Sequence, residues 1–114
     1  MSDDGRIWVR FGTVDEAEPG EALLIEGQVP TGGPAVARFV VPARIGGHPA
    51  GCNCCAPRGP VATALGALFL ARARGELPWF RSMVAVTQSA AGAAAVRAAM
   101  EEDVVTRARF RLET

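Results

Sequence analysis

A helix with its own start and stop signals, running from Gly59-Pro60 to Gly75, is the feature that most restricts the fold of this chain. Proline is favoured at the first position of a helix, and Leu65 and Leu68 follow at the spacing of one helical face. Gly75 is typical of the residue just beyond a helix end. Segments with the composition of strands stand on both sides of this helix, so the sequence predicts the α/β class.

Short runs rich in apolar, aromatic and β-branched residues predict the strands of a sheet. Three such runs precede the helix, at Ile7–Phe11, Ala22–Glu26 and Ala35–Val41, and Gly/Pro turns separate them. A fourth run follows the helix, at Phe80–Thr87. We therefore expect residues 1–114 to form one small α/β domain, with a central sheet of about four or five strands and two helices packed on it.

The last quarter of the chain contains a second helix and a segment with two interpretations. Ser89 is a favourable N-cap for an alanine-rich helix that extends to about Glu102, and its small side chains indicate close packing on the sheet. Beyond this helix, arginines and apolar residues alternate over residues 107–112 as on a half-exposed strand, whereas Val104–Arg109 could instead extend the helix. In the strand interpretation, one solvated face carries the arginines at positions 107, 109 and 111.

The composition excludes several classes of function. Twelve basic and twelve acidic side chains leave no net charge to attract nucleic acid or anionic lipid. All twelve basic residues are arginines, so mechanisms that need a Schiff-base lysine or a P-loop lysine are excluded. The N-terminus shows no signal segment, and no apolar run approaches the ~20 residues of a membrane span. We therefore expect a cytoplasmic protein without a nucleic-acid or membrane partner.

The strongest chemical feature is a run of three cysteines in four positions, GCNCC at residues 51–55, with the only histidine, His48, just upstream. Thiolates this close in sequence can converge on one borderline or soft metal, such as zinc or copper(I). A disulfide requires a specific separation and dihedral angle, and an odd number of cysteines in a reducing compartment argues against a disulfide scaffold. The sequence therefore predicts zinc as the cofactor, with Cys52, Cys54 and Cys55 as ligands and His48 as the candidate fourth ligand.

Other interpretations of these residues stay open. Three small, half-buried cysteines could simply pack in one turn. Cys52 and Cys55 have C-x-x-C spacing, so a thiol redox protein with a reversible disulfide is one alternative. A metal-free protein interaction module is another. A hydrolase with His48 as its acid or base has little support, because no carboxylate lies within fifteen residues of it.

The cysteine run is part of a longer pattern that resembles a known family. GCNCC at residues 51–55, Arg58, the helix end ARARGE at residues 71–76 and RFRL at residues 109–112 look like the middle of the CobW family of P-loop GTPase metallochaperones. The resemblance covers about Gly51–Thr114. It implies a reduced P-loop GTPase core that handles zinc or cobalt, and it places the family's G-C-x-C-C motif on Gly51, Cys52, Cys54 and Cys55. It also implies a protein partner such as a full-length CobW homologue.

The nucleotide-binding motifs of that family do not transfer to this chain. Residues 27–34 contain the two glycines of G-x-x-x-x-G-K-[ST], but Gly33 stands in place of the lysine and Pro34 in place of the magnesium-binding hydroxyl. The segment is therefore either a decayed P-loop or a plain Gly/Pro turn between strands. The strand that carries E-T-T-G in the family reads VAVTQS at residues 84–89 and lacks the carboxylate. We expect a metallochaperone-like protein that is not an enzyme and has no GTPase activity.

Overall fold

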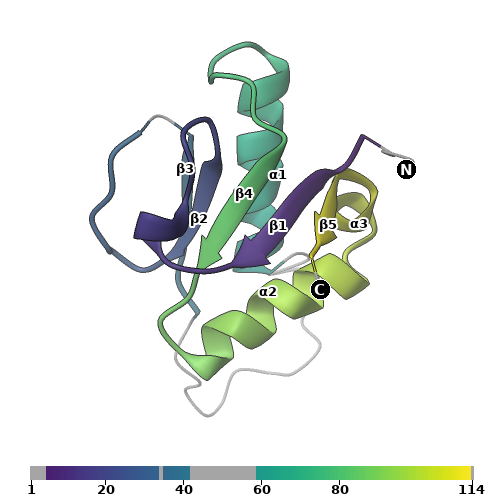
Figure 1. Ribbon diagram of the computed structural model, residues 1–114. Helices are drawn as coiled ribbons and strands as arrows, with labels where there is room; N and C mark the ends of the chain where they lie inside the picture. The colour runs from purple at the N-terminus through teal and green to yellow at the C-terminus, as the bar shows by residue number, and fades with distance from the viewer. Residues whose placement is uncertain (1–4, 34, 42–58, 114) are drawn as a thin grey trace.

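Five parallel strands form one sheet in the computed structural model, which describes residues 5–33, 35–41 and 59–113 (Figure 1). The strands are β1 (Ile7–Phe11), β2 (Ala22–Glu26), β3 (Val36–Phe39), β4 (Ser82–Val86) and β5 (Phe110–Leu112). The helices are α1 (Pro60–Ala73), α2 (Ala90–Glu102) and α3 (Val104–Arg109), with a 3-10 turn, η1 (Val14–Glu16). The strand order is β3-β2-β4-β1-β5, and every neighbouring pair is parallel. The predicted α/β class and sheet size are confirmed.

The directions of the connections explain why the α-helices pack on one face of the sheet. The connections from β3 to β4 and from β4 to β5 step toward the β5 edge, and each contains a helix. The connections from β1 to β2 and from β2 to β3 step the other way. Because crossovers between parallel strands are right-handed, the two sets lie on opposite faces. The second face is therefore covered by η1 and by loops, since residues 12–21 and 27–33 contain no α-helix.

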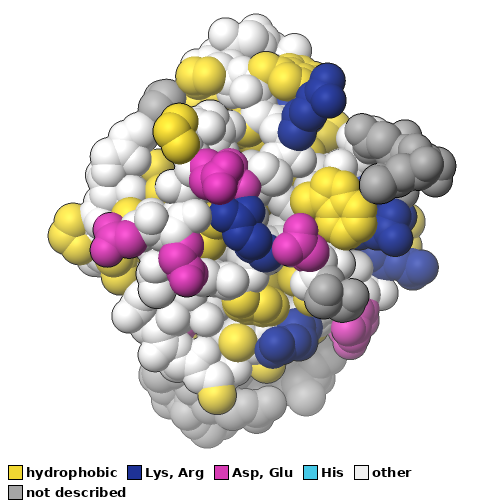
Figure 2. Space-filling view, in the orientation of Figure 1, with side chains coloured by type: hydrophobic (Ala, Val, Ile, Leu, Met, Phe, Trp, Pro, Cys, Tyr) yellow, Lys and Arg dark blue, Asp and Glu magenta, His cyan; other side chains and the backbone are white. Residues whose placement is uncertain are grey.

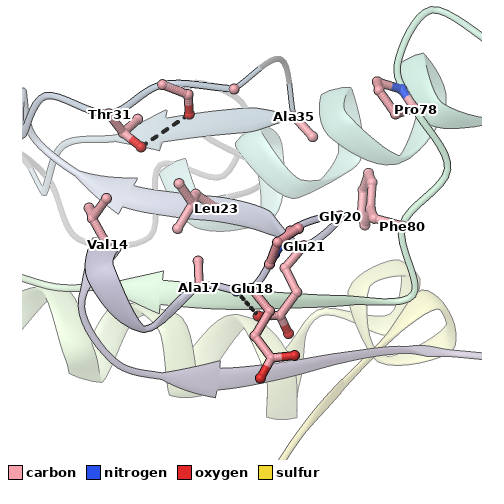
Figure 3. A pocket seen from close by; sticks show the side chains of 13 residues that line it. Val14, Ala17, Glu18, Gly20, Glu21, Leu23, Thr31, Ala35, Pro78 and Phe80 are labelled. Atoms are coloured by element: carbon pink, nitrogen blue, oxygen red, sulfur yellow. Dashed lines mark hydrogen bonds between the residues drawn. The ribbon is translucent and has the colours of Figure 1, made fainter.

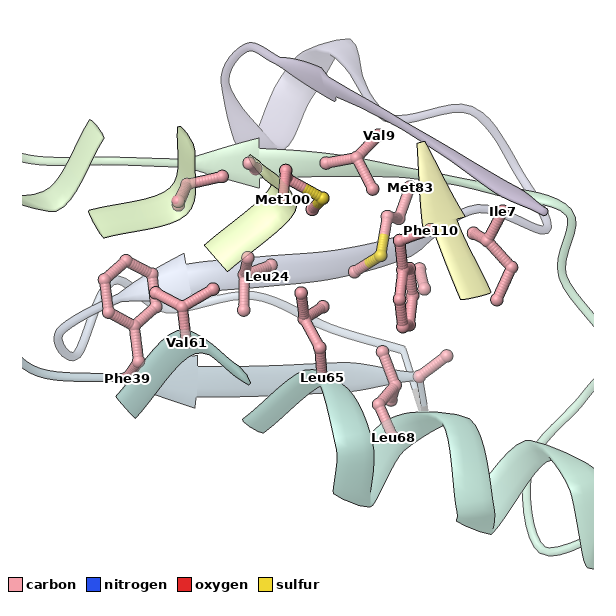
Figure 4. Close-up of a cluster of buried hydrophobic side chains, with 14 of the residues drawn as sticks. Ile7, Val9, Leu24, Phe39, Val61, Leu65, Leu68, Met83, Met100 and Phe110 are labelled. Carbon is pink, nitrogen blue, oxygen red and sulfur yellow. The ribbon is translucent and has the colours of Figure 1, made fainter. Parts of the chain in front are cut away.

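The main hydrophobic core lies between the sheet and the helices (Figure 4). Val61, Leu65 and Leu68 of α1 are buried, as the predicted helical face requires, and Phe69 is partly buried beside them. Figure 4 shows Leu65 pointing from α1 toward Leu24 of β2, and neither side chain has exposed surface. The predicted packing of this helix on the sheet is confirmed.

The second face of the sheet has a covered half and an open half. Over β2 and β4, η1 and its neighbouring loop pack on a small apolar cluster of Leu23, Ile25, Val84 and Val86. Over β1, the face carries Trp8 and Arg10, which are partly exposed. Figure 2 views this face and shows basic and acidic side chains next to one another near its centre. The open half is therefore a polar surface with mixed charge.

The tail contains both of the structures that its sequence allowed. Asp103 begins α3 immediately after α2 ends, because its carboxylate Oδ2 accepts hydrogen bonds from Thr106 N (2.9 Å) and Thr106 Oγ1 (2.8 Å). The chain then extends into β5, whose first residue, Phe110, is buried. The expectation of two helices is corrected to three. Arg107 and Arg109 lie in α3, so the expected strand face with three arginines is wrong and only Arg111 lies on a strand.

The glycine-rich segment after β2 is a connection between strands. A P-loop joins a strand to a helix, whereas residues 27–33 lead from β2 toward β3. Gly27 and Gly33 have φ angles of +84° and +97°, which glycine adopts without steric cost, so they suit a chain that must reverse here. Of the two interpretations of this segment, its course agrees with a plain turn.

Within the described part of the chain, no helix has the length and apolar character needed to cross a membrane.

Candidate functional site

The four predicted metal ligands, His48, Cys52, Cys54 and Cys55, lie outside the described residues. Among residues 5–33, 35–41 and 59–113, no group of three or more His, Cys, Asp or Glu side chains is arranged to hold a metal ion. The structure nevertheless describes the elements on both sides of residues 42–58, the segment that contains these ligands. β3 ends at Phe39 and α1 begins at Pro60, and both ends lie at the carboxyl edge of the sheet. Ligands of open α/β sheets bind at this edge.

The N-terminus of α1 lies at the carboxyl edge of the sheet. Its N-cap is Gly59, which has no side chain to accept hydrogen bonds, and Pro60 occupies the first helical position. The first backbone hydrogen bond of the helix runs from Thr63 N to Gly59 O, at 3.0 Å. The partial positive charge of this helix end therefore favours anionic groups, including thiolates.

A cavity of about 390 Å³ lies beside the start of α1. Its walls come from the first turn of α1 and from the last turns of α2, where alanines predominate. Two carboxylates, Glu102 and Asp103, also line it. Asp103 is occupied in capping α3, whereas Glu102 is exposed. The cavity thus places one exposed carboxylate near the helix end from which the cysteine segment departs.

The N-terminus of α2, at the same edge of the sheet, is capped by two side chains of the protein. Ser89 caps the helix as predicted, accepting a hydrogen bond from Gly92 N at 3.0 Å. The carboxylate of Glu26, at the end of β2, accepts hydrogen bonds from Gln88 N (2.5 Å), Ser89 N (3.1 Å) and Ser89 Oγ (2.7 Å). Burial opposes ionisation of Glu26, but these hydrogen bonds lower its pKa overall. A neighbouring strand therefore supplies the anion that this helix end attracts.

Gly92 is required for this arrangement. A Cβ atom at position 92 would lie 2.0 Å from Glu26 Oε1, so any side chain there displaces the carboxylate. The sequence offers no signal for the pairing, because Glu26 and Gly92 are far apart in the chain and each looks ordinary in its own segment.

Glu26→Gln is expected to lower the free energy of unfolding by about 1 kcal/mol at neutral pH, because it removes the charge at the start of α2 and weakens three hydrogen bonds. The measurement is urea denaturation followed by circular dichroism. Glu101→Gln is the matched control, since Glu101 is exposed on the same helix away from its start, and its effect should stay below about 0.5 kcal/mol. Equal effects of the two substitutions would contradict the assigned role of Glu26.

Another cavity, of about 500 Å³, opens over the amino end of β2 (Figure 3). Most of its lining is apolar, including Val14, Leu23 and Phe80. Its acidic residues are Glu18 and Glu21. Sequence patterns did not predict it, because its walls come from three loops that only the sheet brings together.

Glu21 is the most strongly bound carboxylate of this region. Its Oε1 accepts hydrogen bonds from Arg10 Nη2 and Glu18 N, both at 2.8 Å, and its Oε2 accepts from Ser82 Oγ at 2.7 Å and from Arg10 Nη1. The hydrogen bonds to Arg10 are the main reason that the pKa of Glu21 falls from 4.5 to about 2, against the opposing effect of burial. Glu21 therefore ties β1, β2 and β4 together and is not free to act as a base.

Glu21→Gln is expected to lower the free energy of unfolding at pH 7 by about 3 kcal/mol, the order of magnitude that corresponds to a pKa of about 2 in place of 4.5. Because the pKa is lower in the folded state, this stabilisation is complete above about pH 5 and disappears as the pH falls toward about 2. Denaturation of both proteins at a series of pH values measures the difference. A difference that stays constant over this range would contradict the assignment, and Glu18→Gln is the control from the same loop.

Comparison of the chain with protein-family models, with curated proteins and with solved structures finds no match. The resemblance to the CobW family therefore depends on the motifs in the sequence.

Proposed function

We propose that this protein binds zinc, or a related transition metal, through the thiolates of Cys52, Cys54 and Cys55, with His48 as the candidate fourth ligand. The observation that carries the proposal is the spacing of the three cysteines within four positions. Three thiolates and one imidazole form a donor set that zinc accepts in tetrahedral sites. The three cysteines, together with Gly51, match the G-C-x-C-C motif of the CobW metallochaperones.

Features of the described residues are compatible with a metal site at the carboxyl edge. The chain enters the cysteine segment from β3 and leaves it into α1, so both attachments are at the edge where α/β sheets bind ligands. The partial positive charge at the start of α1 favours thiolates over thiols, and zinc requires thiolates. The exposed Glu102 beside this helix end adds negative charge that favours a cation.

The proposed protein is not an enzyme and does not hydrolyse GTP. It has no lysine to contact a nucleotide phosphate, and residues 27–33 join two strands. At the end of β4, where the family has a carboxylate, the chain reads Val86-Thr87-Gln88. We propose that it acts in the cytoplasm as an accessory protein beside a full-length CobW homologue, with which it shares the metal-binding motif.

The metal content of the protein purified under reducing conditions without chelator tests this function. About one zinc ion per chain is expected, and binding should weaken as the pH falls because protons compete for the thiolates. Protein without metal that forms a reversible Cys52–Cys55 disulfide would favour the redox alternative. Protein with neither metal nor disulfide would favour the interaction module. Both outcomes would reject the zinc proposal.

A further inference from the structure

A third cavity, of about 320 Å³, lies at the amino edge of the sheet, opposite the edge where β3 ends and α1 begins. It is formed where α1 ends and where β1 and β4 begin. Its charged and aromatic lining consists of Arg6, Arg72, Arg81, Trp8 and Trp79. No described carboxylate lines it. This combination of basic and aromatic side chains was not apparent from the sequence, where the five residues are dispersed.

Arg72 is the unusual member of this lining. It continues the buried face of α1 and is only 7 % exposed, although it is charged. Its guanidinium lies 3.5 Å from the ring centroid of Trp79 and 5.2 Å from that of Phe80. These contacts stabilise the charge through the faces of the rings, but they use none of the N–H groups. The Nε atom of Arg72 is buried and has no hydrogen-bond partner.

Two arginines of the cavity, Arg72 and Arg81, repel each other. Burial lowers the pKa of Arg72, and the charge of Arg81 lowers it further. Among the described residues, neither Arg72 nor Arg81 forms a hydrogen bond or ion pair with a carboxylate through its guanidinium. A buried charge without a counter-charge is costly, and a bound anion would offset that cost.

We propose that this cavity binds a small phosphate ester that carries an aromatic ring. Guanidinium groups present forked N–H donors that match the oxygens of phosphate, and several arginines together favour a dianion over a monoanion. The cavity is large enough for more than a phosphate group, and Trp8 and Trp79 offer surfaces for an aromatic ring. The proposed site shares no residue with the proposed zinc ligands.

Titration with phenyl phosphate, followed by intrinsic fluorescence, tests the proposal. Trp8 and Trp79 are the only tryptophans of the chain, and both line the cavity, so the signal reports on the site directly. We expect a saturable change that weakens as salt is raised from about 20 mM to about 300 mM. Benzoate, a monoanion with the same ring, and phenol, which is neutral, should each bind at least about tenfold more weakly.

Arg81→Gln should weaken the binding of phenyl phosphate by at least about tenfold, since it removes a charge-assisted hydrogen-bond donor. Arg81 is exposed, so the variant should keep the unfolding midpoint of the wild type. Arg74→Gln removes the same charge at the end of α1 but outside the cavity, and it should bind as the wild type does. No saturation up to about 10 mM ligand, equal binding by the Arg81 and Arg74 variants, or tighter binding of benzoate would overturn the proposal.

Discussion

Cys54→Ser is expected to abolish zinc binding. Cys54 is the central cysteine of the run, with the other two thiols at positions 52 and 55. A serine hydroxyl is a neutral and hard donor, so the substitution removes both the negative charge and the soft sulfur that zinc prefers. Competition against a chromogenic chelator measures the loss. Asn53→Ser is the matched control, because it changes the same run while keeping all three thiols, and it should bind zinc as the wild type does.

His48→Ala is expected to weaken zinc binding less than Cys54→Ser. Three thiolates already neutralise the dication and supply most of the binding energy, and the fourth position of a zinc site can be filled by water. Equal zinc content in the wild type, the Cys54 variant and the His48 variant would show that these residues are not the ligands. The cysteine run would then serve a redox or packing role.

Leu65→Ala is expected to lower the free energy of unfolding by about 3–5 kcal/mol, a large part of the stability of a small domain. Leu65 lies between α1 and the sheet and has no exposed surface, so the missing methyl groups leave a cavity that the close-packed core cannot fill. Urea denaturation followed by circular dichroism measures the change.

Leu70→Ala is the matched control for the core substitution. Leu70 lies on the same helix but is 43 % exposed, so its replacement should cost less than about 1 kcal/mol. Similar costs at positions 65 and 70 would mean that α1 does not bury the face assigned to it.

The elements with local signals could be predicted from the sequence. Pro60 and Gly75 mark the limits of α1, Ser89 caps α2, and the apolar runs at Ile7–Phe11 and Ala22–Glu26 form strands with those bounds. In each case the residues that determine the element lie within it or next to it. Short-range preferences of the backbone are then sufficient.

The features that depend on distant residues could not be predicted. Asp103 separates α3 from α2, but the change from α3 to β5 depends on the packing of Phe110 in a core built from distant segments of the chain. The capping of α2 by Glu26 and the stacking of Arg72 on Trp79 join segments that no local pattern relates. The cysteine run shows the reverse situation, since its chemistry is evident from spacing while its geometry lies outside the described residues.

The strand order has a consequence for the sequence of events in folding. Of the described strands β1 is synthesised first, but its two neighbours in the sheet are β4 and β5, which are synthesised after the others. Until residues 82–86 leave the ribosome, β1 has no partner, and β2 and β3 can pair only with each other. Sheets with such long-range pairing fold slowly and leave apolar strands unpaired in the meantime. The apolar side chains of Ile7–Phe11 therefore have no strand to pair with until β4 has been synthesised.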